Sequence, residues 1–167
     1  DDETTAVTPF LTYANQIRSV VVENGVTSIG ENAFYGCNRL TSVSLPDTLY
    51  AINSNAFYGC SHLTDIQIPE GTESLSGSAF RNCNALRTLQ FPASLTNCEN
   101  VSYLYACNGL ENFVVDADNP SYASVDGILY NKKKSSLLVV PSAWNQTVLT
   151  VPETVTQIAS EAMDNNQ

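Results

Sequence analysis

The sequence predicts a β-rich solenoid, a fold of short stacked coils, and the repeated segments of the chain are the main reason. Nearly the same hexapeptide occurs three times, ending at Cys37, Cys60 and Cys83. These cysteines are 23 residues apart, a fixed period typical of stacked supersecondary units. Because a solenoid has a long repeated face and no closed pocket, we expect contact with a large partner.

The first half of each unit has the pattern of a short strand. Val43 and Leu45 are two residues apart, as are side chains on one face of a strand, and Pro46 follows. Proline has no amide hydrogen to continue a ladder, so we expect it to end the strand. The same spacing recurs in Ile66, Ile68 and Pro69, and in Leu89, Phe91 and Pro92. We expect these strands to stack in a parallel ladder about 4.8 Å apart.

The second half of each unit is more polar. In the second unit its apolar positions are Leu49, Ile52, Ala56 and Phe57, separated by Asn, Ser and Gly. This predicts an extended or turn-like return leg, with at most a short helical or 3₁₀ turn around the Ala-Phe pair. Aromatic residues at the repeated position should form a buried row of Phe34, Phe57 and Phe80.

The five cysteines occupy repeat positions. Cys37, Cys60 and Cys83 should form a ladder in the core, continued by Cys107 after a one-residue insertion in the fourth unit. Cys98 stands where other units have Ile or Leu, so we expect a core residue there too. No C-x-x-C pair occurs, and the sequence therefore predicts neither a metal site nor a disulfide framework.

The repeat resembles a known family. The pattern L-x-x-V-x-L-P-x-x-V-x-x-I-x-x-x-A-F-x-x-C, present at 40–60, resembles the leucine-rich repeats of the BspA-like surface proteins of bacteria. The resemblance covers about 17–163, and 125–132 resembles the S-x-D-G-V-L-Y-N-K hairpin that members insert between repeats. It implies a leucine-rich-repeat solenoid: a β-rich right-handed superhelix with short parallel strands and one β-hairpin insertion. It also implies a cell-surface or secreted bacterial protein that binds host proteins or other cells.

We expect a single leucine-rich-repeat domain over 1–167. Its parts are an N-terminal cap at 1–16, four regular repeats at 17–109, an irregular repeat with the hairpin at 110–145 and a final partial repeat at 146–167. A short helix at 8–13 should cover the first coil. Two apolar runs, 128–130 and 137–140, predict the hairpin strands.

The charge balance excludes some partners. With 17 acidic and 7 basic residues the formal charge is −10, which opposes binding to nucleic acid or anionic lipid. No apolar run is long enough to insert into a membrane, and we expect a monomer outside the cell or at its surface. The chain begins with Asp1, so any export signal should lie upstream. The lysines of 132–134 form either a solvated turn that protects a strand edge or a contact for an acidic partner.

The sequence predicts no enzyme and no cofactor. The single histidine, His62, lies at a unit boundary, and no nucleophile or orienting acid can be assigned to it. The acidic run 116–119 lacks the glycine and closing glutamate of a calcium loop, so we interpret it as a turn. Asp126 and Gly127 are typical of a hairpin turn or bulge.

The best candidate site is the outward face of the strands, where the positions between buried residues should carry small polar side chains. These positions are Ser42, Ser44, Asp65, Gln67, Thr88, Gln90, Asn112 and Val114. Such a face suits a protein or glycan partner, which would make the chain an adhesin-like binding module. Alternatively, small residues simply tolerate close packing, and the chain is a structural spacer or stalk with no ligand of its own.

Other aromatic residues leave two interpretations open. Tyr35 and Tyr58 should lie on the outer side of the coils. A second group lies in or beside the irregular region and consists of Tyr103, Tyr105, Tyr122, Tyr130 and Trp144. This group either closes the gap left by the interrupted repeat or forms a stacking site for a glycan.

Overall fold

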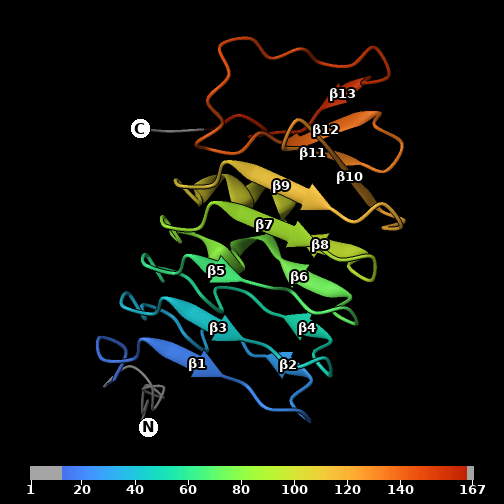
Figure 1. Cartoon of the computed structure of the whole chain (residues 1–167). Coiled ribbons are helices and arrows are strands. Elements are labelled where there is room, and N and C mark those ends of the chain that lie inside the picture. Colours follow the sequence, from blue (N-terminus) through green and yellow to red (C-terminus); the bar gives the residue numbers. More distant parts are fainter. Residues whose placement is uncertain (1–12, 165–167) are drawn as a thin grey trace, which may run out of the picture.

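In the computed structural model, which describes residues 13–164, the chain winds into coils that stack along one axis (Figure 1). Most coils contribute one strand to a front ladder and one to a second ladder beside it. The predicted solenoid of parallel strands is therefore confirmed. The helix expected at 8–13 lies outside the described residues, apart from Tyr13, which starts a turn.

The front ladder contains the strands that the sequence predicts. They are β1 (Ser19–Val21), β3 (Ser42–Ser44), β5 (Asp65–Ile66), β7 (Thr88–Phe91) and β9 (Asn112–Val115). All pairs are parallel, and Val43 aligns with Val20 on one side and Ile66 on the other. Pro92 directly follows β7, as expected of a residue that cannot continue a ladder. The ladder is divided, because β5 and β7 belong to separate sheets.

The return legs are more regular than the sequence analysis predicts, because they contain a second parallel ladder. Its strands are β2 (Ser28–Ile29), β4 (Ala51–Ile52), β6 (Ser74–Ser76) and β8 (Asn97–Glu99). Ile52 aligns with Leu75, and Leu75 with Cys98, so the predicted core role of Cys98 is confirmed. The 3₁₀ helices η1 (Gly77–Phe80) and η2 (Val101–Ala106) follow β6 and β8.

Left-handed residues turn the chain at the end of the first three return legs. Gly36, Gly59 and Asn82 occupy the same repeat position with φ of 72°, 73° and 62°. Glycine has no Cβ to clash in this conformation, and asparagine tolerates it better than most residues. This requirement explains why Gly or Asn directly precedes the repeated cysteine.

The predicted aromatic row is present. The rings of Phe34 and Phe57 stack with centroids 5.3 Å apart, and those of Phe57 and Phe80 with centroids 5.5 Å apart. Phe57 and Phe80 are fully buried. Phe34 is only half-buried, which differs from the expectation of a wholly buried row.

The cysteine ladder connects neighbouring coils. The thiols of Cys60, Cys83 and Cys107 donate hydrogen bonds of 3.3, 3.1 and 2.8 Å to carbonyls of the preceding coil. All five cysteines are free and buried. Burial raises the pKa of Cys60, Cys98 and Cys107 to about 12, so these thiols stay protonated and can donate.

The insertion after β9 is larger than the predicted hairpin. β11 (Ile128–Asn131) and β12 (Ser136–Val139) pair antiparallel as expected, but β10 (Tyr122–Val125) adds a third strand before them. β10 was not predicted because its sequence, Tyr-Ala-Ser-Val, shows no alternation of apolar and polar residues, and in the structure all four residues are half-buried. Asp126 and Gly127 connect β10 to β11 with φ of 52° and 80°, the geometry of a two-residue hairpin turn.

The solenoid resumes only in part after the insertion. β13 (Gln157–Ile158) pairs in parallel with β12, which therefore serves as the second-ladder strand of the fifth coil. Residues 148–150, at the front-ladder position of the last coil, form no strand. Leu149 packs instead in a second core cluster with Tyr130 and Leu137.

Alkaline pH should destabilise the protein through its buried thiols. Because their pKa is raised, the native state retains thiol protons that the unfolded state loses above the ordinary value of 9.0. The free energy of unfolding should therefore be unaffected by these thiols below pH 9 and fall as pH rises from about 9 to about 12. Urea unfolding at several pH values measures this. Cys98→Val should show a shallower fall, whereas rapid reaction of the native protein with a thiol reagent at pH 8 would contradict the burial.

Gly127→Ala should lower stability for two reasons. The left-handed φ costs a residue with a Cβ about 1–2 kcal/mol. The added Cβ would also lie 2.6 Å from the side-chain oxygen of Asn112. Urea unfolding measures the loss, and the matched control is Gly30→Ala, whose new Cβ meets nothing within 4 Å and whose φ is not positive. Equal stability of the two variants would show that the turn is not formed as described.

Candidate functional site

The predicted face residues lie on or beside the front ladder, and most of them are exposed. Ser42 aligns with Asp65, Thr88 with Asn112, and Gln90 with Val114. Thr88 is only half-buried, and 49% of Val114 is exposed. The face is therefore polar and open over β3, β5 and β7, with one apolar side chain over β9.

Four of these residues meet at one shallow hollow on the front face. Ser44, Asp65, Gln67 and Gln90 line this front hollow, which has a volume of about 490 Å³. It lies where the front ladder is divided between β5 and β7. Ser42, Thr88, Asn112 and Val114 do not line it.

The front hollow combines an acidic rim with apolar parts. Asp47, Asp65 and Glu70 contribute three carboxylates, and no lysine or arginine lines the hollow. Apolar lining comes from Val43, Leu45, Ile68 and Pro69. Carboxylates beside apolar surface suit a Lys or Arg side chain, whose stem packs on carbon while its charged end meets the acids.

The sequence analysis missed Asp47 and Glu70. Both follow the strand-ending proline directly, in the pairs Pro46-Asp47 and Pro69-Glu70. This repeated Pro-acid pair was an available signal, since equal repeat positions lie side by side in a solenoid. The carboxylate of Glu70 also accepts a hydrogen bond of 3.4 Å from the amide of Ala93 in the next coil.

The other residues that the sequence analysis considered as candidate sites make contacts within the protein. His62 is exposed, and its Nδ1 contacts the carbonyl oxygen of Asn38 in the preceding coil. Asp116 accepts a hydrogen bond of 2.8 Å from the amide of Asp118, which is a turn contact. Lys132 donates to the carbonyl of Ala117 at 2.7 Å, so part of the lysine cluster is tied to the protein itself.

Asn119, in the same acidic run, is a buried turn residue. Its amide nitrogen donates to the carbonyls of Pro92 and Leu95, at 2.7 and 2.8 Å. Its side-chain oxygen accepts from the amides of Ser121 and Tyr122, at 2.9 and 2.8 Å. The first two bonds connect the start of the insertion to the preceding coil, and the other two hold the local turn. Within the described residues, no group of three His, Cys, Asp or Glu could hold a metal ion.

The outer tyrosines form a stacked row. The rings of Tyr35 and Tyr58 are parallel with centroids 4.7 Å apart, and 41% of Tyr35 is exposed. Arg81 follows at the next repeat position, with its guanidinium 5.9 Å from the centre of the Tyr103 ring. The side-chain Nδ2 of Asn82 donates to the Tyr58 hydroxyl at 3.0 Å. These contacts connect residues of successive coils on the outer side of the stack.

Tyr122 and Tyr130 of the insertion pack into the core where the repeat is interrupted, which favours closure of the gap for these two residues. Tyr122 packs edge-on against Phe91, with centroids 5.3 Å apart, and its hydroxyl accepts a hydrogen bond from the amide of Cys98. Tyr130 is 1% exposed, and Trp144 packs beside it in the second core cluster. The side chain of Tyr105 lies outside the described part.

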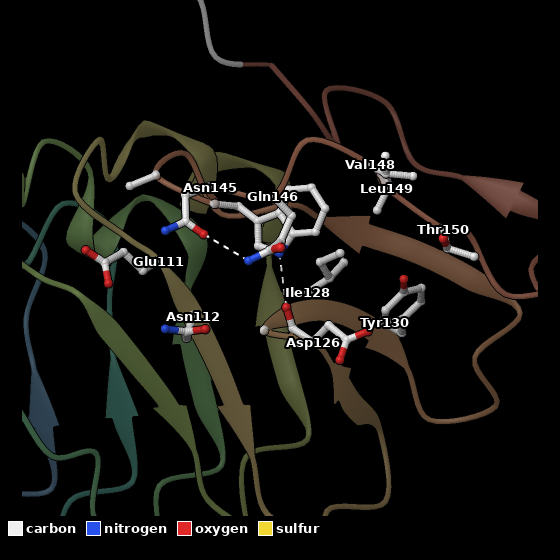
Figure 2. Close-up of a pocket in the computed structure, with 13 residues that line it drawn as sticks. Glu111, Asn112, Asp126, Ile128, Tyr130, Asn145, Gln146, Val148, Leu149 and Thr150 are labelled. Carbon is white, nitrogen blue, oxygen red and sulfur yellow. Dashed lines mark hydrogen bonds between the residues drawn. The ribbon is translucent and has the colours of Figure 1, made fainter.

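A second hollow, of about 600 Å³, lies between β9, the hairpin turn and the segment 143–150 (Figure 2). We call it the junction hollow. Polar side chains line it from two sides: Asn112 and Asp126 on one, and Asn145 and Gln146 on the other. The sequence analysis did not predict it, because no repeat position signals a place where a strand fails to form.

Comparison with known proteins identifies the repeat. A profile described as the BspA type leucine-rich repeat region matches residues 8–124 in six copies. A search of curated proteins finds no match. In the described part of the chain, no helix has the length and apolar character needed to cross a bilayer.

Several solved bacterial structures are similar. A leucine-rich repeat protein from Eubacterium ventriosum is 25% identical, with a TM-score of 0.76 over 99% of this chain and 50% of its own. A leucine-rich cell surface protein from Faecalibacterium prausnitzii is 25% identical, with a TM-score of 0.51 over 92% of this chain and 54% of its own. The pneumococcal vaccine antigen PcpA, 24% identical with a TM-score of 0.74 over 89% of this chain and 43% of its own, shares the fold. The chain thus spans about half the length of these proteins.

Proposed function

Because the chain belongs to the family of BspA-type leucine-rich repeat proteins, we propose that it is a cell-surface or secreted module that binds a partner protein through its front face. The observation that carries the proposal is the front hollow, where Ser44, Asp65, Gln67 and Gln90 meet. The description of the Faecalibacterium relative as a cell surface protein supports the location. The proposal assigns no reaction to the chain.

The charge of the front hollow favours a basic segment of the partner. Its three carboxylates have no cationic neighbour in the lining, and the whole chain carries a formal charge of −10. A field of this sign attracts basic partners and repels polyanions. The apolar lining beside the acids gives the stem of a Lys or Arg side chain a surface to contact. A host protein or a protein of another cell with an exposed basic segment fits this surface best.

Reversing the charge of the front hollow should abolish this binding. The double variant Gln67→Lys with Gln90→Lys places two cations among the acids, and both side chains are exposed, so the fold should tolerate them. We expect at least a tenfold loss of capture of proteins from an extracellular-matrix extract by the immobilised domain. Capture by the unchanged domain should also weaken between 50 and 500 mM NaCl.

A matched control separates the front hollow from a general charge effect. Asn97→Lys with Gln157→Lys adds the same charge at exposed positions of β8 and β13, outside the front hollow. This variant should retain capture. Equal capture by both double variants would contradict a site on the front face, and absence of any salt-sensitive capture would favour the structural spacer.

A further inference from the structure

The junction hollow exists because the last coil lacks its front strand. In the earlier coils a strand at this position covers the preceding one, whereas residues 148–150 form no strand over β9. The hairpin turn occupies only part of the vacant place, where the amide of Phe113 donates to the carbonyl of Gly127 at 2.8 Å. The insertion thus creates a concave site that a regular solenoid does not have.

The walls of the junction hollow are held in place. The amide of Ala143 donates to the carbonyl of Leu110 at 2.8 Å, which connects the outer segment to the preceding coil. The indole nitrogen of Trp144 donates to the carbonyl of Asp126 at 3.1 Å. A site with fixed walls loses little conformational freedom when a ligand binds.

Tyr130 contributes to the wall of the junction hollow. Tyr130 lines the hollow and is 1% exposed, and its hydroxyl makes no hydrogen bond within residues 13–164. Every fully buried side-chain oxygen of the described residues has a hydrogen-bond partner, so the Tyr130 hydroxyl is itself not fully buried. Burial and the nearby carboxylate of Asp126 raise the pKa of Tyr130, which keeps the hydroxyl protonated as a donor.

The lining groups select a chemical class of ligand. Asn112, Asn145 and Gln146 carry amides that both donate and accept, and Asp126 accepts only. The negative charge of the Glu111 carboxylate is partly compensated by the guanidinium of Arg87, with Nε and Oε1 3.7 Å apart. An anion would be repelled by the two carboxylates, and a cation could not use the amide donors. Sugar hydroxyls both donate and accept, and the carbon face of a sugar ring packs on an aromatic side chain such as Trp144.

We propose that the junction hollow binds a neutral carbohydrate, with Asp126 and Tyr130 as its main hydrogen-bonding residues. The volume of about 600 Å³ is in the range of small-molecule sites and accommodates one or two sugar rings. This site is separate from the front hollow, with which it shares no lining residue. The chain would therefore bind a protein on one surface and a glycan at the junction.

Trp144 is the only tryptophan of the chain, so its fluorescence reports directly on the junction hollow. The probes are methyl glycosides of glucose, galactose, mannose and N-acetylglucosamine, with their β-linked disaccharides. At least one should change the emission of Trp144 saturably, with a Kd on the order of 1 mM, as expected for a small polar ligand. No saturable change with any of these probes would overturn the proposal.

Two conservative variants test the assigned residues. Tyr130→Phe removes the hydroxyl but keeps the ring, and Asp126→Asn removes the charge at a left-handed turn position that asparagine also accepts. Each should weaken glycoside binding at least tenfold while the urea midpoint stays near that of the unchanged protein. The controls Tyr35→Phe and Asp118→Asn make the same chemical changes outside the hollow and should bind normally.

Two results would contradict the assignment. Glycoside binding that both site variants retain would place the sugar elsewhere. The second result is a saturable change in Trp144 emission with N-acetyl-lysine methylamide but with no glycoside. If Asp126→Asn also abolished that change, the junction hollow would be a cation site, and the carbohydrate assignment would be wrong.

Discussion

The whole structure depends on coils of equal length that place equivalent residues next to each other. Thiol-to-carbonyl hydrogen bonds connect successive coils from Cys60 to Cys107, and stacked phenylalanine rings connect the first three. The fourth unit shows how strict this requirement is. Its extra residue lies between β8 and Cys107, where η2 has six residues against four in η1, and Leu89 still aligns with Phe113. The extra residue of the fourth coil is accommodated in its return leg, so the pairing of the front-ladder strands does not change.

The same repetition explains what could be predicted from the sequence. Positions such as Phe57 and Cys83 recur at a fixed spacing, so one assignment applies to every coil and the core could be named in advance. The second ladder was missed because its strands are only two or three residues long and each has a single buried apolar position, too few to show an alternation. β10 was missed because it occurs once. An element that occurs only once in the chain leaves no repeated pattern from which it could be predicted.

Both candidate sites lie where the repetition is interrupted. The front hollow lies at the division between β5 and β7, and the junction hollow lies where the last coil has no front strand. Regular coils cover one another and leave a flat surface, whereas an interruption leaves a concavity lined by side chains from several elements. Of the eight face residues proposed from the sequence, four line the front hollow, and Asn112 lines the junction hollow instead. The alternation of apolar and polar residues within the strands predicted which side chains are exposed. It could not predict where the front ladder divides into two sheets.

The most direct test of this account is a double-mutant cycle on neighbouring coils. Phe57→Leu and Phe80→Leu remove two rings that stack with an interplanar angle of 2°, and a stacked pair should show a coupling free energy of about 0.5–1.5 kcal/mol in urea unfolding. The comparison cycle of Phe57→Leu with Phe113→Leu, from a coil further along the stack, should be additive. Equal coupling in both cycles, or none between Phe57 and Phe80, would contradict the alignment of repeat positions on which the fold and both sites depend.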